Sequence, residues 1–222
     1  MRGGGHFALS TVTALHQKWD ILATTSTRMI LMKKTLALLL GTTLSLCAAD
    51  VTVATLYDSQ LKMAEGEFVS LAKAMPESAY SFAPTQGAFE KVRTFGEQVK
   101  HVATVMYMVA AAAKQEAPPV DLGTGEAGPP ALKSKAEIVK YLQDSFAYAH
   151  TSMAMLTAAN QLDLVKAPFP GMPDTARAGI ANLAIWHAFD HYGQMVVYAR
   201  MNNVIPPASQ PAPPPMGAKK KK

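Results

Sequence analysis

The sequence predicts an all-α fold, namely a four-helix bundle with a long connection between its first and second helices. Four segments carry apolar residues at the spacing of a buried helix face. No segment alternates apolar and polar residues in the way that would demand a strand. Proline and glycine gather between the four segments, where they favour turns and loops. The predicted bundle spans residues 50–207, which is the size of one domain with a single core.

The first helix is predicted over residues 53–74, and Met75 and Pro76 end it. Its apolar markers are Leu56, Leu61, Met63, Ala64, Phe68, Leu71 and Ala72. The connection that follows carries Pro84 and Gly87 and is long for a link inside a bundle.

Two capping boxes predict where the second and third helices begin. In this motif an N-cap hydroxyl accepts from the main chain three residues on, and the carboxylate there accepts from the N-cap main chain. Thr94 with Glu97 starts a helix that reaches about Lys114, and Ser134 with Glu137 starts the next. The buried stripe of the second helix is Phe95, Val99, Val102, Met106 and Val109. That of the third helix is Ile138, Tyr141, Leu142, Phe146, Ala149 and Met153.

Two histidines lie beside these stripes. His101 falls next to the second helix's stripe, together with Gln98 and Met108, and is expected to point at or near the core. His150 follows Ala149 at the edge of the third helix's stripe, so we interpret it as structural or surface-exposed, with a role near a site as the alternative.

The fourth helix is predicted within residues 176–207, after a segment broken by three prolines. Asp174 is expected to cap its N-terminus. Helical spacing assigns one face of it to the interior: Ile180, Leu183, Ala184, His187, His191, Gln194, Met195 and Tyr198.

His187 and His191 therefore share the interior face, one turn apart. A buried neutral imidazole has a donor and an acceptor that both need partners. A neighbouring hydroxyl or carbonyl is the usual partner of a single core histidine. The pair at this spacing favours a metal ion instead, because helical zinc sites use the same separation.

Residues 32–49 have the pattern of a secretory signal peptide. Lys33 and Lys34 precede an apolar run over 35–46, and small residues come before Asp50. This run is shorter than the roughly 20 residues that span a bilayer, so we expect no transmembrane segment after cleavage. An uncleaved internal apolar helix is the alternative.

We expect translation to start at Met32 or Met29, which makes residues 1–31 a gene-model extension. The only cysteine, Cys47, would be removed with the signal, so the mature chain could form no disulfide. A lipid anchor there is disfavoured by the bulky Leu46. The expected location is periplasmic or secreted.

The net charge excludes a nucleic-acid surface. The whole chain carries +5, but residues 1–49 hold five basic residues and one acid, which leaves +1 without them. Lys219–Lys222 supply all of that excess, so the bundle offers no basic face for a phosphate backbone. Residues 208–222 are rich in proline and lysine and are expected to be a disordered tail, or else a spacer toward an anionic surface.

Two blocks of the sequence resemble the DinB-like superfamily, which also holds YfiT-type metal-dependent hydrolases and bacillithiol or mycothiol S-transferases. They are MPESAYSFAPTQGAFEKVRTFGEQVKHVA and HAFDHYGQMVVYARMNNVIPP, and the resemblance covers about residues 56–207. It implies a DinB-like four-helix bundle with a divalent metal held by three histidines. These would be His101, His187 and His191.

Three imidazoles leave at least one coordination position for water or substrate, which is typical of a reactive site. An all-nitrogen set suits zinc, nickel or iron. Glu97 and Gln194 each lie one turn from a histidine and are candidates to orient ligands. The alternative for Glu97 is a role in capping the helix, and the alternative for Gln194 is a buried hydrogen bond. Asp190 is expected to be solvated. The alternative is that it contacts a metal-binding histidine without binding the metal itself.

Other metal chemistries are disfavoured by spacing. A zincin needs glutamate after the first histidine, where this chain has Ala188. A ferritin-like di-iron bundle needs Glu-x-x-His motifs, and the sequence contains none.

Two classes of function follow. The first is a metal-dependent hydrolase or thiol S-transferase acting on a small molecule. The second is a non-catalytic helical binding or stress-response module that the metal stabilises. Export disfavours the transferase version, because low-molecular-weight thiols are mainly cytosolic. Assembly is left open, with a homodimer as one option.

Overall fold

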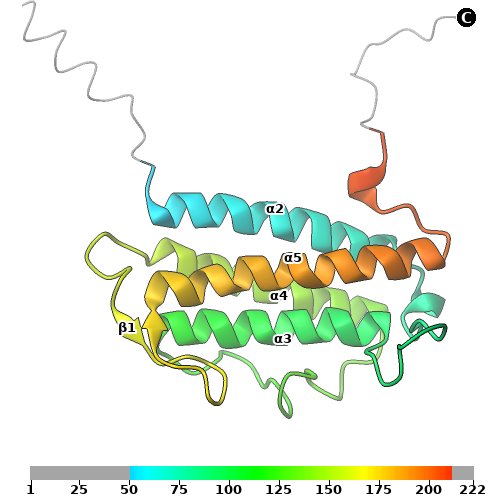
Figure 1. Cartoon of the computed structure of the whole chain (residues 1–222), viewed down its shortest axis with the longest axis horizontal. Helices are drawn as coiled ribbons and strands as arrows, with labels where there is room; N and C mark the ends of the chain where they lie inside the picture. Colours follow the sequence, from blue (N-terminus) through cyan, green and yellow to red (C-terminus); the bar gives the residue numbers. More distant parts are fainter. Residues whose placement is uncertain (1–50, 212–222) are drawn as a thin grey trace, which may run out of the picture. The chain divides into compact units, whose positions relative to one another are not determined.

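A computed structural model describes residues 51–211, which form a bundle of four long helices (Figure 1). The elements in chain order are α2 (Val53–Ala74), η1 (Glu77–Ala79), α3 (Phe95–Lys114), α4 (Lys135–Ala154), β1 (Leu164–Val165), β2 (Thr175–Ala176), α5 (Arg177–Met201) and η2 (Pro207–Ser209). The predicted four-helix bundle is therefore confirmed. The predictions for residues 1–31 and for a signal over 32–49 lie outside the described residues.

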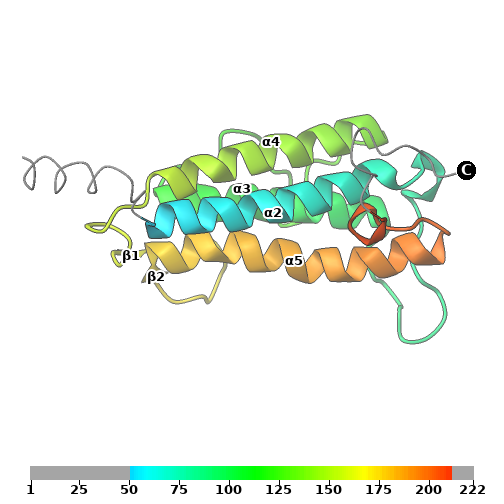
Figure 2. The same cartoon turned by 90° about the horizontal axis from the view of Figure 1, so that it is seen from above.

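The four helices occupy the corners of a square in cross-section. α2 packs on α4 and α5, and α3 packs on the same two helices, so α2 and α3 are diagonal to each other. Figure 2 shows α2 and α5 side by side with α4 on the other side of α2. Because α3 and α5 are adjacent, residues from the predicted second and fourth helices can meet.

All three connections between the helices are long, and the third, over residues 155–176, contains β1 and β2. The first, between α2 and α3, was expected and contains the short helix η1. The second, over residues 115–134, returns along α3, because α3 and α4 run in the same direction (Figure 1). This second connection brings loop residues against the side of α3.

Side-chain caps define the starts of three helices. The predicted capping boxes at Thr94 and Ser134 are both present. A third, unpredicted one uses Thr52 and Thr55 at the start of α2. Each satisfies main-chain N–H groups that have no partner inside the helix.

The predicted cap of the fourth helix at Asp174 is wrong. α5 begins at Arg177, and no side chain caps it. The main-chain N–H groups of Arg177 and Ala178 donate instead to the carbonyls of Asp163 and Gln161, at 2.8 and 2.9 Å. These contacts continue from a two-residue antiparallel pairing of β1 with β2, which sequence periodicity could not detect.

The core follows the predicted stripes of α3 and α4, whose members are all buried. The stripe of α2 is partly wrong, because Leu56 and Met63 are exposed. Gln194 on α5 was predicted to face the interior and is also exposed. The largest fully buried side chains include Phe68, Phe95, Phe146, Leu142, Ile180 and Met195.

The described part of the predicted tail is ordered by local contacts. η2 begins at Pro207 and packs against α2. Arg200 donates to the hydroxyl of Ser209 at 3.0 Å. Residues 212–222 lie outside the described part. None of the helices within residues 51–211 has the length and apolar character needed to cross a bilayer.

Candidate metal centre

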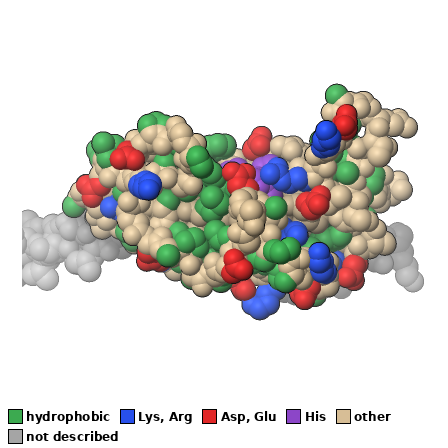
Figure 3. Space-filling view, turned by 90° about the horizontal axis from the view of Figure 1, so that it is seen from below, with side chains coloured by type: hydrophobic (Ala, Val, Ile, Leu, Met, Phe, Trp, Pro, Cys, Tyr) green, Lys and Arg blue, Asp and Glu red, His purple; other side chains and the backbone are tan. Residues whose placement is uncertain are grey.

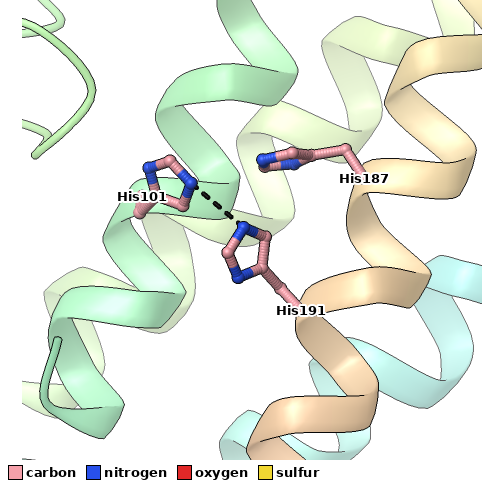
Figure 4. Close-up of side chains that lie close together, drawn as sticks. All are labelled: His101, His187 and His191. Atoms are coloured by element: carbon pink, nitrogen blue, oxygen red, sulfur yellow. Dashed lines mark hydrogen bonds between the residues drawn. The ribbon is translucent and has the colours of Figure 1, made fainter. Parts of the chain in front are cut away.

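Three histidine side chains from two adjacent helices converge on one point (Figure 4). His101 comes from α3, and His187 and His191 come from successive turns of α5. One nitrogen from each ring lies within 4.8 Å of those of the other two. The Nε2 atoms of His101 and His191 are 3.1 Å apart. These are the three residues that the sequence singled out, and the packing of α3 on α5 brings them together.

All three rings are neutral at physiological pH. Burial lowers the pKa of His187 to about 3, and the neighbouring His191 and His101 add to the effect. Burial also lowers the pKa of His191 to about 4. The pKa of His101 is lowered too, first by burial and then by the charge of Arg93. Each imidazole therefore keeps a lone pair that a metal ion can accept.

The orientation of His101 is fixed by the connection that returns along α3. Its Nδ1 lies 3.1 Å from the main-chain oxygen of Glu126, which can only accept, so Nδ1 carries the proton. Nε2 is then the lone-pair nitrogen, and it is the atom that faces His191. A histidine ligand held from behind by a carbonyl is the arrangement that proteins use to orient metal-binding imidazoles.

Gly128 lets this connection approach α3 closely. Its φ is +79°, and an added Cβ would lie 2.9 Å from Oγ1 of Thr104 and 3.2 Å from Cβ of Lys100. A side chain would therefore meet both an unfavourable backbone conformation and a steric clash. The glycine is what allows the Glu126 carbonyl to reach His101.

His191 has a buried polar atom without a partner among the described residues. Its side chain is nearly buried, and Nδ1 makes no hydrogen bond. If no metal bridged the rings, Nε2 of His191 would donate to His101 and leave Nδ1 as an unpaired acceptor. If Nε2 of His191 bound a metal ion, Nδ1 would carry the proton and would still lack a partner among the described residues. Nδ1 points away from the other two rings (Figure 4).

The donor set fits a divalent transition metal. Two nitrogens bound to one tetrahedral zinc ion lie about 3.3 Å apart, because each Zn–N bond is about 2.0–2.1 Å. The Nε2 pair at 3.1 Å already has nearly this spacing. Three neutral imidazoles suit zinc, nickel or iron, and the geometry does not choose among them.

The sequence of residues 60–195 matches the family described as the DinB superfamily, and this covers more than half of the chain. The chain belongs to the DinB superfamily. No curated protein matches the DinB chain described here.

Solved structures with this fold share little sequence with the chain. A conserved protein from Enterococcus faecalis has a TM-score of 0.55 and 17% identity, over 68% of this chain and 97% of that one. A DinB-like protein from Bacillus subtilis has a TM-score of 0.52 and 18% identity, over 70% and 99%. A DinB-like protein from Bacillus cereus has a TM-score of 0.53 and 14% identity, over 68% of this chain and 93% of that one. At these identities the likeness shows the DinB-like fold.

A cavity of about 620 Å³ opens beside His191 of this DinB bundle. It is lined by Pro84, Phe89, Lys91, Val92, Arg93, Gln98, His191, Gln194, Val197 and Tyr198. Its walls thus come from the connection before α3, from the first turns of α3 and from α5. Figure 3 shows histidine side chains reaching the surface of the bundle between acidic side chains and Lys or Arg side chains. The cavity is a route by which a small molecule can reach His191.

The predicted helper residues have different surroundings. The carboxylate of Glu97 accepts two hydrogen bonds from Thr94, one from its main-chain N–H at 2.8 Å and one from its hydroxyl at 2.9 Å. Glu97 therefore serves as part of the cap. Gln194 accepts from Gln98 at 3.3 Å and donates to Asp190 at 3.1 Å. Gln194 therefore lies at the rim of the cavity, and Asp190 is exposed beside it.

His150 lies outside the cluster and joins two helices. Its Nδ1 is 2.5 Å from Asp58 and its Nε2 is 3.3 Å from Glu65, both on α2. This is the structural role that its position at the edge of the α4 stripe suggested.

Four residues at the DinB site, Phe89, Arg93, Glu126 and Gly128, were not identified from the sequence. Glu126 contributes a main-chain oxygen, which no side-chain pattern can reveal. Arg93 and Phe89 lie in the first block that carries the resemblance, but the resemblance implies no role for either residue. The positive φ of Gly128 points to a close approach, and the glycine-rich composition of that connection was the available signal.

Proposed function

We propose that this DinB protein is a metal-dependent enzyme in which His101, His187 and His191 hold one divalent cation. The observation that supports it best is the convergence of three neutral imidazoles within 4.8 Å beside a cavity large enough for a small substrate. The reaction class is hydrolysis by water or transfer of a thiol to a small organic molecule.

The residues of the site would act by position and by charge state. The Glu126 carbonyl holds His101 with its lone pair toward the other two rings. Burial keeps His187 and His191 unprotonated at neutral pH, so protons do not compete for the same lone pairs. When bound, a divalent cation supplies Lewis acidity, which lowers the pKa of a water or a thiol toward neutrality.

The amide side chains would orient what enters the cavity. Gln98 is almost fully buried, and its Oε1 has no hydrogen-bond partner among the described residues. Its Nε2 is held by Gln194, so the acceptor is fixed in place. Gln98 and Gln194 therefore form a fixed polar part of the cavity wall.

A cobalt-substituted sample tests the open site. A thiol or a hydroxamate should change the visible spectrum if a coordination position is available. No change with any of several such ligands would favour the second candidate, a helical module that the metal only stabilises. That candidate draws support from the fact that the three histidines join α3 to α5. A panel of esters, amides and thiol acceptors then separates hydrolysis from thiol transfer.

Export is part of the proposal and rests on the sequence of residues 32–49 alone. The mature N-terminus should lie near Asp50, and the protein should be recovered from the periplasm or medium. Peptides from residues 1–28 in the mature protein, detected by mass spectrometry, would contradict it.

A further inference from the structure

The cavity beside His191 has a chemical character that the metal alone does not explain. Its lining contains two cationic side chains, Lys91 and Arg93, and no aspartate or glutamate. The remaining lining is largely apolar, and Phe89 and Val197 are 42% and 52% exposed there. The surface of this cavity therefore combines positive charge with uncovered apolar area.

Arg93 is available to a ligand. Its guanidinium has no ion pair and no hydrogen bond with any side chain among residues 51–211, whereas its main-chain oxygen accepts from the Tyr198 hydroxyl at 3.2 Å. That hydrogen bond fixes the backbone of Arg93 against α5. Lys91 is already paired with Glu90 at 3.5 Å, so it is the weaker of the two anchors.

Three carboxylates around the cavity have other partners. Glu97 accepts from Thr94 in the cap of α3, Asp190 accepts from Gln194, and Glu90 pairs with Lys91. None of the three lines the cavity. Arg93 thus forms no ion pair with a carboxylate among residues 51–211, and its planar guanidinium matches a carboxylate of a ligand.

We propose that this cavity binds a small organic carboxylate, with its negative group on Arg93 and its apolar part on Phe89, Val92, Val197 and Tyr198. Arg93 and His191 line the same cavity, so a carboxylate held by Arg93 keeps the rest of the molecule close to His191. The inference rests on the proposed function, since it names the substrate class of the same site.

The test uses isothermal titration calorimetry to compare the affinities of the full-length protein for phenylacetate, phenylacetamide and acetate. Phenylacetamide has the same shape without the charge, and acetate has the charge without the ring. Each is titrated into zinc-loaded and into chelator-treated protein, because a carboxylate can also coordinate a metal directly. In the metal-free protein, phenylacetate should bind about tenfold or more tightly than either of the others.

Two substitutions locate the binding. Arg93→Gln should abolish the preference for phenylacetate over phenylacetamide. Val197→Glu places a negative charge at an exposed position in the cavity. It should weaken the binding of phenylacetate more than the binding of phenylacetamide. Arg200→Gln is the matched control, because Arg200 lies on α5 outside the cavity lining and bonds Ser209. It should leave the preference unchanged.

The outcomes separate this inference from the metal proposal. Equal affinity for phenylacetate and phenylacetamide, absence of phenylacetate binding, or a preference that survives Arg93→Gln would overturn the inference. Elemental analysis of the same samples reports on the metal independently. A chain that prefers phenylacetate but takes up no zinc, nickel or iron would refute the metal proposal and leave the carboxylate cavity standing.

Discussion

Nδ1 of His101 lies 3.1 Å from the main-chain oxygen of Glu126, a residue that is 25 positions away in a loop. This single contact determines which nitrogen of His101 carries the proton. It also couples the metal-binding geometry to the path of the connection between α3 and α4. A perturbation of that loop should therefore reach the metal without touching any ligand.

Gly128→Ala tests this coupling. The added methyl group would clash with Thr104 and push the loop from α3, so the Glu126 carbonyl should leave His101 and metal affinity should fall about tenfold or more. Competition with a chromogenic chelator measures the affinity. Gly125→Ala is the matched control, since its φ is +64° but nothing lies within 4 Å of the new atom. Both variants should lose about 1 kcal/mol of stability from the strained backbone, and equal metal affinity in both would contradict the coupling.

The three histidines should act as one unit. Replacing His101, His187 or His191 by alanine should remove most of the metal, and a chelator should destabilise the parent protein in the same way. Metal at a hundredfold excess over its Kd adds about 2.7 kcal/mol. For a domain of this size the loss lowers the Tm by roughly 5–10 °C. Differential scanning calorimetry and elemental analysis provide the two measurements.

His150→Ala supplies the control for the histidine variants. It removes the contacts with Asp58 and Glu65, so the Tm should fall while metal content and the response to chelator stay as in the parent. If His187→Ala keeps full metal occupancy, the three residues do not form one site. Core histidines without a metal would each act separately and independently of chelator.

Glu97→Ala distinguishes a capping residue from a catalytic one. Glu137 occupies the same position in the capping box of α4, and its hydrogen bonds involve no histidine. Both alanine variants should lower the free energy of unfolding by similar amounts, as measured with urea, and neither should alter the spectrum of the cobalt form. A spectral change in Glu97→Ala alone would assign it a role at the metal.

Stability should depend on pH through the buried histidines. Their pKa values are lowered in the folded state, to about 3 for His187 and about 4 for His191, from the usual 6.5. At pH values below about 6.5 and above the folded-state pKa values, the unfolded chain therefore binds more protons than the folded chain. The free energy of unfolding decreases as the pH falls from about 6.5 toward 4. Urea denaturation of metal-free protein across this range measures the slope. The slope should decrease in His187→Ala, and an unchanged slope would show that His187 does not titrate on unfolding.

Local chemistry in the sequence was sufficient for most of the secondary structure. The capping boxes at Thr94 and Ser134 fix the starts of α3 and α4, because their hydrogen bonds involve residues three positions apart. Met75 ends α2 as expected. The stripes of α3 and α4 are buried as predicted, since each packs against two other helices.

Predictions failed where a tertiary contact replaced a local one. The start of α5 needs no side-chain cap, because carbonyls of Gln161 and Asp163 accept from its first N–H groups. Leu56, Met63 and Gln194 have helical spacing with buried residues, yet they lie at the edges of the stripes, where the neighbouring helices no longer cover them.

The sequence by itself determined the helices, the i, i+4 pair of His187 and His191, and through its resemblance the choice of His101 as their partner. Only the tertiary structure decided that α3 lies beside α5, which brings the third imidazole to the pair. It also decided that a loop carbonyl orients His101 and that Arg93 enters a cavity with His191. The reason is physical: a main-chain oxygen and a cavity leave no periodic signal in the sequence, because both arise from segments that meet only after the chain has folded.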